Sequence, residues 1–150
     1  MTSADALIQL RKIVKQKGLK YTEQREVVLK VLLTASDHLT AEEVYASVKK
    51  QFPESNIGIA TVYRALSFLE DVNLITSIAF GPDGKKFESN IKTHHDHLIC
   101  TTCDKIVEFI DYVIEKRQVD IARKHHFKIL SHSMQLYGEC AECQAKKEKE

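Results

Sequence analysis

A chain of 150 residues with 43% hydrophobic and 29% charged residues can form one compact domain or two small ones around an apolar core. No apolar run approaches the ~20 residues that span a bilayer, and no secretion signal opens the sequence, so we expect a cytoplasmic protein without a membrane segment. The formal net charge is only +1, but between residues 11 and 30 seven basic residues face two acidic ones. Such a stretch suits a phosphate-binding surface or, equally, a solvated helix face.

The first half of the chain is predicted to be mainly helical. Apolar residues recur at helical spacing over residues 4–17, and Gly18 ends that run. Thr22 is the predicted N-cap of a second helix. A capping-box sequence, Thr40–Glu43, begins a third helix, and Pro53 ends that region.

A fourth helix is expected over residues 58–72, and the pattern then changes. Residues 75–80 are rich in β-branched and aromatic side chains, and the turn sequence 81–84 connects them to a second extended stretch at 85–88. Helices followed by a β-hairpin are the order of a winged helix-turn-helix. We therefore expect a DNA-binding domain over residues 1–89.

The second half, residues 90–150, is predicted to mix short strands with helix. The expected elements are a polar connector at 90–97, strands at 98–100 and 106–109, a helix at 111–125, a strand at 128–137 and a frayed charged tail at 144–150. The fold class is therefore α+β.

The fourth helix is the candidate for reading DNA. Its predicted buried stripe consists of Ile59, Val62, Leu66 and Leu69. Thr61, Tyr63 and Arg64 then lie outside that stripe, near the start of the helix. A hydroxyl, a phenol and a guanidinium in this place suit contacts to phosphates and base edges in a major groove. The alternative is a surface helix without a ligand.

Two CxxC pairs predict a metal site. They are Cys100–Cys103 and Cys140–Cys143. Four thiolates around one ion form a closed tetrahedral zinc site, which is structural because no coordination position stays open. The alternative is two disulfides or idle thiols.

The sequence His94-His-Asp-His97 is a second candidate for metal binding. In an extended segment alternate side chains point to opposite faces, so His95 and His97 are expected on one face and His94 and Asp96 on the other. This short stretch could supply two separate sites. Nitrogen and oxygen donors suit divalent iron, zinc, manganese or cobalt, whereas the alternative is a solvated loop.

Together these features resemble the ferric uptake regulator family over residues 7–143. The matching pieces are Thr22–Arg25, Gly58–Arg64, His94–His97 and the two CxxC pairs. The resemblance implies a winged-helix DNA-binding domain followed by an α/β dimerisation domain. One departure is Asp104, where the family often has glycine.

The resemblance also implies ligand sets and DNA contacts. Structural zinc is expected at Cys100, Cys103, Cys140 and Cys143. A regulatory metal is expected at His38, Glu88, His95, His97 and Glu108. An additional site is expected at His94, Asp96, Glu115 and His132. The expected DNA contacts are Tyr63 and Arg64, with Lys17 or Lys20 reaching a minor groove.

The function implied by the resemblance is an Fe2+-dependent transcriptional repressor of iron-uptake genes. Mn2+, Co2+ or Zn2+ are expected to substitute for Fe2+. The partners implied are an A·T-rich palindromic duplex and a second copy of the chain, with a tetramer as the alternative assembly. Glu88 and Glu108 favour an iron regulator over peroxide-sensing members, which tend to use aspartates, and zinc-responsive members are a further alternative. A zinc-dependent hydrolase and a metal-storage protein are the competing classes, but no nucleophile motif, HExxH helix or phosphate-binding glycine loop is present.

Overall fold

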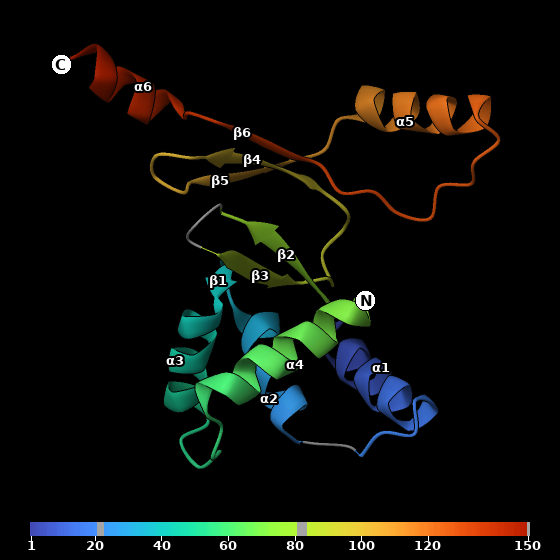
Figure 1. Cartoon of the computed structure of the whole chain (residues 1–150), viewed down its shortest axis with the longest axis vertical. Coiled ribbons are helices and arrows are strands. Elements are labelled where there is room, and N and C mark those ends of the chain that lie inside the picture. Colours follow the sequence, from blue (N-terminus) through green and yellow to red (C-terminus); the bar gives the residue numbers. More distant parts are fainter. Residues whose placement is uncertain (21–22, 81–83, 150) are drawn as a thin grey trace. The chain divides into compact units, whose positions relative to one another are not determined.

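A computed structural model describes residues 1–20, 23–80 and 84–149 of the chain (Figure 1). These residues form two compact units, Met1–Thr93 and His94–Glu150. The division falls after Thr93, whereas the sequence analysis placed a boundary after residue 89. The predicted N-cap Thr22 and the first three residues of the turn at 81–84 lie outside the described residues. Among the described residues, no helix combines the length and apolar character that a membrane span requires.

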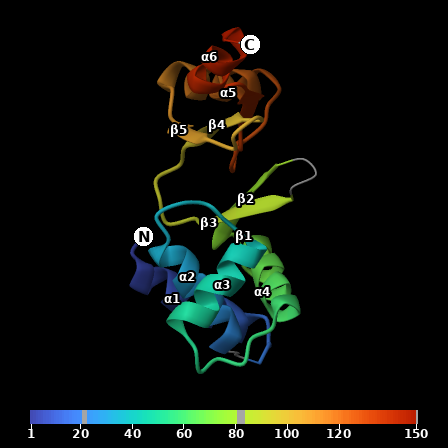
Figure 2. The ribbon, with the colours of Figure 1, turned by 90° about the vertical axis from the view of Figure 1, so that its left-hand side faces the viewer.

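Four helices and a small sheet form the first unit. The helices are α1 (Ser3–Gln16), α2 (Glu23–Thr34), α3 (Ala41–Gln51) and α4 (Ile59–Asp71). The predicted capping box at α3 is present, because the Thr40 hydroxyl accepts from the Glu43 backbone N–H and the Glu43 carboxylate accepts from the Thr40 backbone N–H. A second capping box, between Thr2 and Asp5, begins α1. Figure 2 shows α3 and α4 lying beneath the hairpin β2–β3.

The sheet of this unit contains a strand that the sequence analysis did not predict. Besides the expected hairpin, β2 (Ile75–Ala79) and β3 (Lys85–Ser89), a two-residue strand β1 (Leu39–Thr40) pairs with β3. The strand order is β1-β3-β2, and both pairings are antiparallel. Two residues are too few to give an alternating pattern, so β1 escapes prediction from periodicity.

The apolar core of this unit joins all four helices to the sheet. On α4, Val62, Leu66 and Leu69 are buried as predicted, but Ile59 is 39% exposed and Ala65 is buried in its place. The prediction for Ile59 was wrong because it is the first residue of the helix, where its side chain lies beyond the packed stripe.

The second unit contains a three-stranded sheet and two helices, one between its second and third strands and one after the third strand. Its elements are β4 (Asp96–Cys100), β5 (Ile106–Phe109), α5 (Tyr112–Lys124), β6 (Gln135–Gly138) and α6 (Ala141–Glu148). The strand order is β5-β4-β6, with β4 antiparallel to β5 and parallel to β6.

Three predictions for this unit need correction. β4 begins at Asp96, so the end of the expected connector is strand. The strand expected at 128–137 is much shorter, because β6 covers Gln135–Gly138 and so includes only the last three expected residues and one beyond them. The tail expected to be frayed from residue 144 belongs to α6 as far as Glu148, because the helix begins immediately after Cys140.

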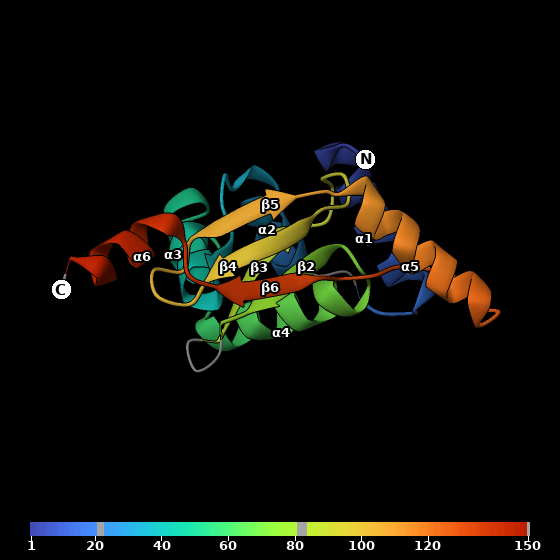
Figure 3. The same cartoon turned by 90° about the horizontal axis from the view of Figure 1, so that it is seen from above.

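Helix α5 leaves its apolar side chains in solvent. No residue of α5 is buried, and Val113, Val119 and Ile121 are among its exposed apolar residues. Seen from above, the strands β5, β4 and β6 lie side by side, and α5 extends beyond one end of them (Figure 3). An amphipathic helix gains most of its stability from burying one face, so α5 lacks that stabilisation within the described residues of one chain.

Candidate metal centres and nucleic-acid interface

The four cysteines converge in the second unit. Cys100 ends β4, Cys103 lies in the turn to β5, and Cys140 and Cys143 lie at the start of α6, where Cys140 is the N-cap. The Sγ atoms of Cys100 and Cys143 are 3.8 Å apart, as are those of Cys103 and Cys140. A disulfide requires about 2.0 Å, whereas four sulfurs at ~2.3 Å from one zinc ion lie about 3.8 Å from each other. All four cysteines are unbridged, and their positions fit a tetrahedral zinc site.

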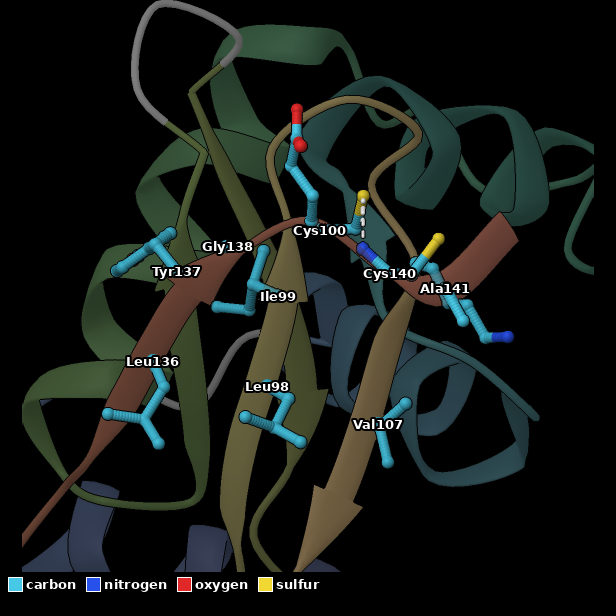
Figure 4. A pocket seen from close by; sticks show the side chains of 11 residues that line it. Leu98, Ile99, Cys100, Val107, Leu136, Tyr137, Gly138, Cys140 and Ala141 are labelled. Carbon is cyan, nitrogen blue, oxygen red and sulfur yellow. Dashed lines mark hydrogen bonds between the residues drawn. The ribbon is translucent and has the colours of Figure 1, made fainter. Parts of the chain in front are cut away.

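Backbone donors prepare this cluster for thiolates. The Cys140 backbone N–H points at the Cys100 sulfur from 3.4 Å (Figure 4). This donor and the Cys103 N–H lower the pKa of Cys100 to about 6. The neighbouring Cys140 thiol, together with burial, raises the pKa of Cys143 to about 12. One negative charge is thus favoured among the cysteines, and further thiolates need a cation beside them.

Asp104 completes the turn after the first CxxC pair. Its φ angle is 61°, in the left-handed region, and its backbone N–H donates to the Cys100 carbonyl at 2.9 Å. Aspartate tolerates this region better than most residues. The departure from the family's glycine therefore keeps the turn geometry.

A second cluster in the same unit combines His94, Asp96, Glu115 and His132. Their candidate ligand atoms all lie within 4.8 Å of one another. His132 Nε2 is 3.1 Å from Glu115 Oε1, and both imidazoles are 3.6 Å from Asp96 Oδ1. Ligands at ~2.1 Å from one tetrahedral ion lie about 3.4 Å apart, so this spacing fits a divalent cation.

The burial of Asp96 strengthens this assignment. Its side chain is 1% exposed, and neither carboxylate oxygen has a hydrogen-bond donor among the described residues. A buried carboxylate without a partner is costly, because desolvation removes the water that stabilises its charge. A cation held by Asp96 with His94 and His132 offsets that cost.

Two further candidate ligands meet in the first unit. The register of β1 with β3 places Leu39 opposite Phe87, so His38 lies beside Glu88, and Nε2 of His38 is 3.0 Å from Oε2 of Glu88. Both side chains are buried. Burial lowers the pKa of His38, but the hydrogen bonds and charges of Glu88 and Asp37 outweigh that effect and leave the pKa raised.

The other residues that the sequence analysis expected at the regulatory metal meet in the second unit. His97 on β4 is paired with Glu108 on β5, and the rings of His95 and His97 are 4.7 Å apart. His95 Nε2 is 3.5 Å from Glu108 Oε1. The alternation expected within His94–His97 is observed, because His95 lies with His97 and Glu108 while His94 lies with Asp96.

The exposed face of α4 carries two polar side chains held in place by neighbours. The Tyr63 hydroxyl donates to Glu42 Oε1 of α3 at 2.6 Å, and the Arg64 guanidinium donates to Thr61 Oγ1 at 3.1 Å. Tyr63 is 47% exposed, although it is aromatic. The Glu42 carboxylate raises the pKa of Tyr63, and the phenol lowers the pKa of Glu42. Glu42 was not predicted from the sequence, because no motif singles it out.

The basic stretch at 11–30 divides into cations that contact side chains of the first unit and lysines that stay exposed. Arg11 and Lys30 contact the buried Glu26 at 3.2 and 2.9 Å, and Arg25 stacks on the Phe68 ring at 4.2 Å from its centroid. The lysines that remain exposed are Lys12, Lys15, Lys17 and Lys20. Lys17 and Lys20 flank Gly18, whose φ of 65° turns the chain at the end of α1.

A shallow apolar surface covers one face of the second sheet. Leu98, Val107 and Leu136 come from β4, β5 and β6, and Figure 4 shows them on neighbouring strands beside the cysteine cluster. Each is 43–45% exposed. An open apolar sheet face next to an unpacked amphipathic helix is typical of a surface that a partner covers.

Comparison with known proteins identifies relatives of this chain. The model of the "Ferric uptake regulator family" matches residues 16–137. The ferric uptake regulation protein of Campylobacter jejuni is 50% identical over 146 residues, which cover 97% of this chain and 93% of that protein. The solved structure of the Helicobacter pylori ferric uptake regulator, described as having three functional metal-binding sites, matches with a TM-score of 0.82 and 41% identity, covering 96% of this chain and 95% of that one. A Francisella tularensis ferric uptake regulator with iron matches with a TM-score of 0.69 and 33% identity, over 85% and 96% of the two chains.

Proposed function

Because the chain belongs to the ferric uptake regulator family, we propose that it is an Fe2+-dependent repressor that binds operator DNA of iron-uptake genes as a homodimer. The observation that carries the proposal is the combination of a thiolate cluster with two separate sets of nitrogen and oxygen ligands in a chain that also presents Tyr63 and Arg64 on an exposed helix face. A structural ion suits the closed thiolate cluster, and exchangeable ions suit the mixed ligands.

We assign the regulatory ion to ligands from both units. His38 and Glu88 are the contribution of the first unit, and His95, His97 and Glu108 are that of the second. Joining them through one ion would restrict the motion of the DNA-binding unit relative to the dimerisation unit. A tenfold gain in DNA affinity needs only ~1.4 kcal/mol of such coupling. The four ligands His94, Asp96, Glu115 and His132 would hold an additional ion that ties β4 to α5.

We assign the dimer interface to the open sheet face and α5. The second unit exposes Leu98, Val107 and Leu136 on its sheet and Val113, Val119 and Ile121 on its helix. A second copy of the same chain can cover both surfaces reciprocally, as a two-fold axis requires. The recognition helices, α4 of each copy, would then face the two half-sites of a palindromic duplex. We propose that this duplex is A·T-rich.

A DNA-binding titration tests the function. The probe is a duplex selected from a randomised pool by the Mn2+-loaded protein, and its dissociation constant is measured with Fe2+ without oxygen, with Mn2+ and with chelator. We expect either metal to raise affinity at least about tenfold, equivalent to the coupling above. We expect His95→Ala to lose most of that gain while it keeps its zinc and its dimer.

The matched control is His126→Asn, because His126 lies at a φ of 59°, which asparagine tolerates, and belongs to no ligand cluster of the described residues. Its response to metal should equal that of the parent. Equal DNA affinity of the chelated and loaded parent at one ionic strength would refute the regulatory role and favour a storage protein or an enzyme.

A further inference from the structure

We propose that Glu42 is a positioning residue that determines how Tyr63 reads DNA, an inference that rests on the proposed function. The two side chains come from different helices, α3 and α4, and meet through the 2.6 Å hydrogen bond from the phenol to Glu42 Oε1. Both side chains are exposed. The contact is thus made on the surface that the reading helix presents, rather than inside the core.

A carboxylate on a phosphate-binding surface is unfavourable unless it has a role there, because it repels the DNA backbone. Its neighbour Glu43 has a structural role, since it completes the capping box with Thr40. Glu42 takes no part in that box. The α3 N-terminus stabilises its negative charge, and its oxygen is directed at Tyr63.

The hydrogen bond limits what Tyr63 can do. A phenol has one donor, and Glu42 occupies it. The Tyr63 hydroxyl therefore has no proton to offer a phosphate, and the ring, held at one end, presents its edge and face. The base feature that suits an aromatic edge in the major groove is the C5-methyl group of thymine. Glu42 thereby converts Tyr63 from a phosphate contact into a contact specific for thymine.

The test compares Glu42→Gln, Glu42→Ala, Tyr63→Phe and the double variant Glu42→Ala/Tyr63→Phe in the Mn2+-loaded dimer. The probes are the duplex selected by the parent and the same duplex with single thymines replaced by deoxyuridine, which lacks only the methyl group. For the parent we expect about a fourfold loss of affinity at one thymine per half-site, the equivalent of one buried methyl group. Glu42→Gln keeps an acceptor and should keep that discrimination.

Glu42→Ala and Tyr63→Phe should each lose the discrimination, and the double variant should lose no more than either single variant. Glu42→Gln and Glu42→Ala remove the same charge, so both should change the dependence of affinity on salt equally. Zinc content should be unchanged in all four variants, and the melting temperature should fall by no more than a few degrees, because both side chains are exposed and the Glu42 charge at the α3 N-terminus contributes only a small stabilisation.

Two results would overturn the inference. One is that Glu42→Gln and Glu42→Ala tighten binding alike and leave every deoxyuridine penalty intact, which makes Glu42 a repulsive charge only. The other is an unaltered penalty in Tyr63→Phe. Arg64→Ala distinguishes failure of this inference from failure of the proposed function. If the parent binds the selected duplex and Arg64→Ala binds it weakly, α4 contacts DNA even where the inference about Glu42 is wrong.

Discussion

At the scale of single residues, side chains that lie close in sequence belong to different clusters of candidate metal ligands. Within four residues, His94 and Asp96 lie with Glu115 and His132, while His95 and His97 lie with Glu108. The alternation of an extended backbone produces this separation without any special turn. A substitution at one of these positions is therefore expected to affect one site and spare the other.

The cysteine cluster allows a prediction at this scale. Cys100→Ser should abolish stoichiometric zinc and unfold the second unit or dissociate the dimer, because Cys143 is the only residue of α6 that is buried and the ion would tie it to β4. In such sites the free energy of metal binding, on the order of 10 kcal/mol, contributes directly to the free energy of folding. Zinc per chain and thermal unfolding are the measurements.

The control for this prediction is Thr102→Ala, because Thr102 lies between Cys100 and Cys103. Its exposed side chain makes one long hydrogen bond of 3.4 Å. It should retain zinc and melt within a few degrees of the parent. A Cys100→Ser protein with the parent's stability and no zinc would contradict the structural role of the ion.

At the scale of elements, α1 is tied to α2 by an ion-pair network as well as by apolar contacts. Glu26 of α2 is 9% exposed and accepts hydrogen bonds from Arg11 of α1 at 3.2 and 3.3 Å. Lys30, one helical turn further along α2, is 2.9 Å away. Burial raises the pKa of Glu26, but the combined effect of Lys30 and Arg11 lowers it by more than burial raises it. The pKa in the folded protein therefore lies below 4.5.

This network predicts a pH dependence of stability. A carboxylate with a lowered pKa stabilises the fold above its unfolded pKa, and this contribution disappears as pH falls through the lower folded value. Glu26→Gln should therefore cost ~1 kcal/mol at neutral pH, a modest value because both cations are partly exposed. The difference in unfolding free energy from the parent should stay constant above pH 4.5, the ordinary value, and shrink below it.

Urea unfolding of both proteins from pH 7 to about pH 3 measures this difference, and zinc loss in acid affects both alike. Glu23→Gln makes the same chemical change at an exposed position of the same helix and should have a smaller effect at neutral pH. A Glu26→Gln difference that is independent of pH would show that packing, rather than charge, accounts for the loss.

At the scale of the whole molecule, the second unit is incomplete as a single copy. Its sheet has an open apolar face and its longest helix has no buried residue. Small folded units rarely expose such surfaces to water, because apolar surface that stays exposed contributes no hydrophobic stabilisation to the fold. Dimerisation and folding of this unit are therefore expected to be linked.

The substitution Ile121→Asp tests the proposed dimer. Ile121 is 51% exposed, so the change should not disturb the packing within one copy. Removing a buried isoleucine from an interface costs at least about 1.5 kcal/mol per copy, and the two-fold axis repeats the loss, so the dimer dissociation constant should rise by a factor of about 100 or more.

Sedimentation of the protein over a range of concentrations measures that dissociation constant. Lys116→Gln is the control, because it makes the net charge of α5 more negative by the same one unit at an exposed position, and it should leave the dimer intact. If Ile121→Asp sediments as the parent does, α5 does not lie in the interface.

Features that depend on neighbouring residues could be predicted before the fold was known. Helical periodicity and the capping box at Thr40–Glu43 located α1, α3 and α4 to within a residue or two. The CxxC spacing and the alternation in His94–His97 indicated ligand groups, because each depends on local backbone geometry. The tertiary structure decided the features that join distant residues. His38 meets Glu88 only because the two-residue strand β1 pairs with β3, and Tyr63 meets Glu42 only because α3 packs near α4. Such contacts depend on how elements pack after the chain has closed long loops, and no pattern within a short window contains that information.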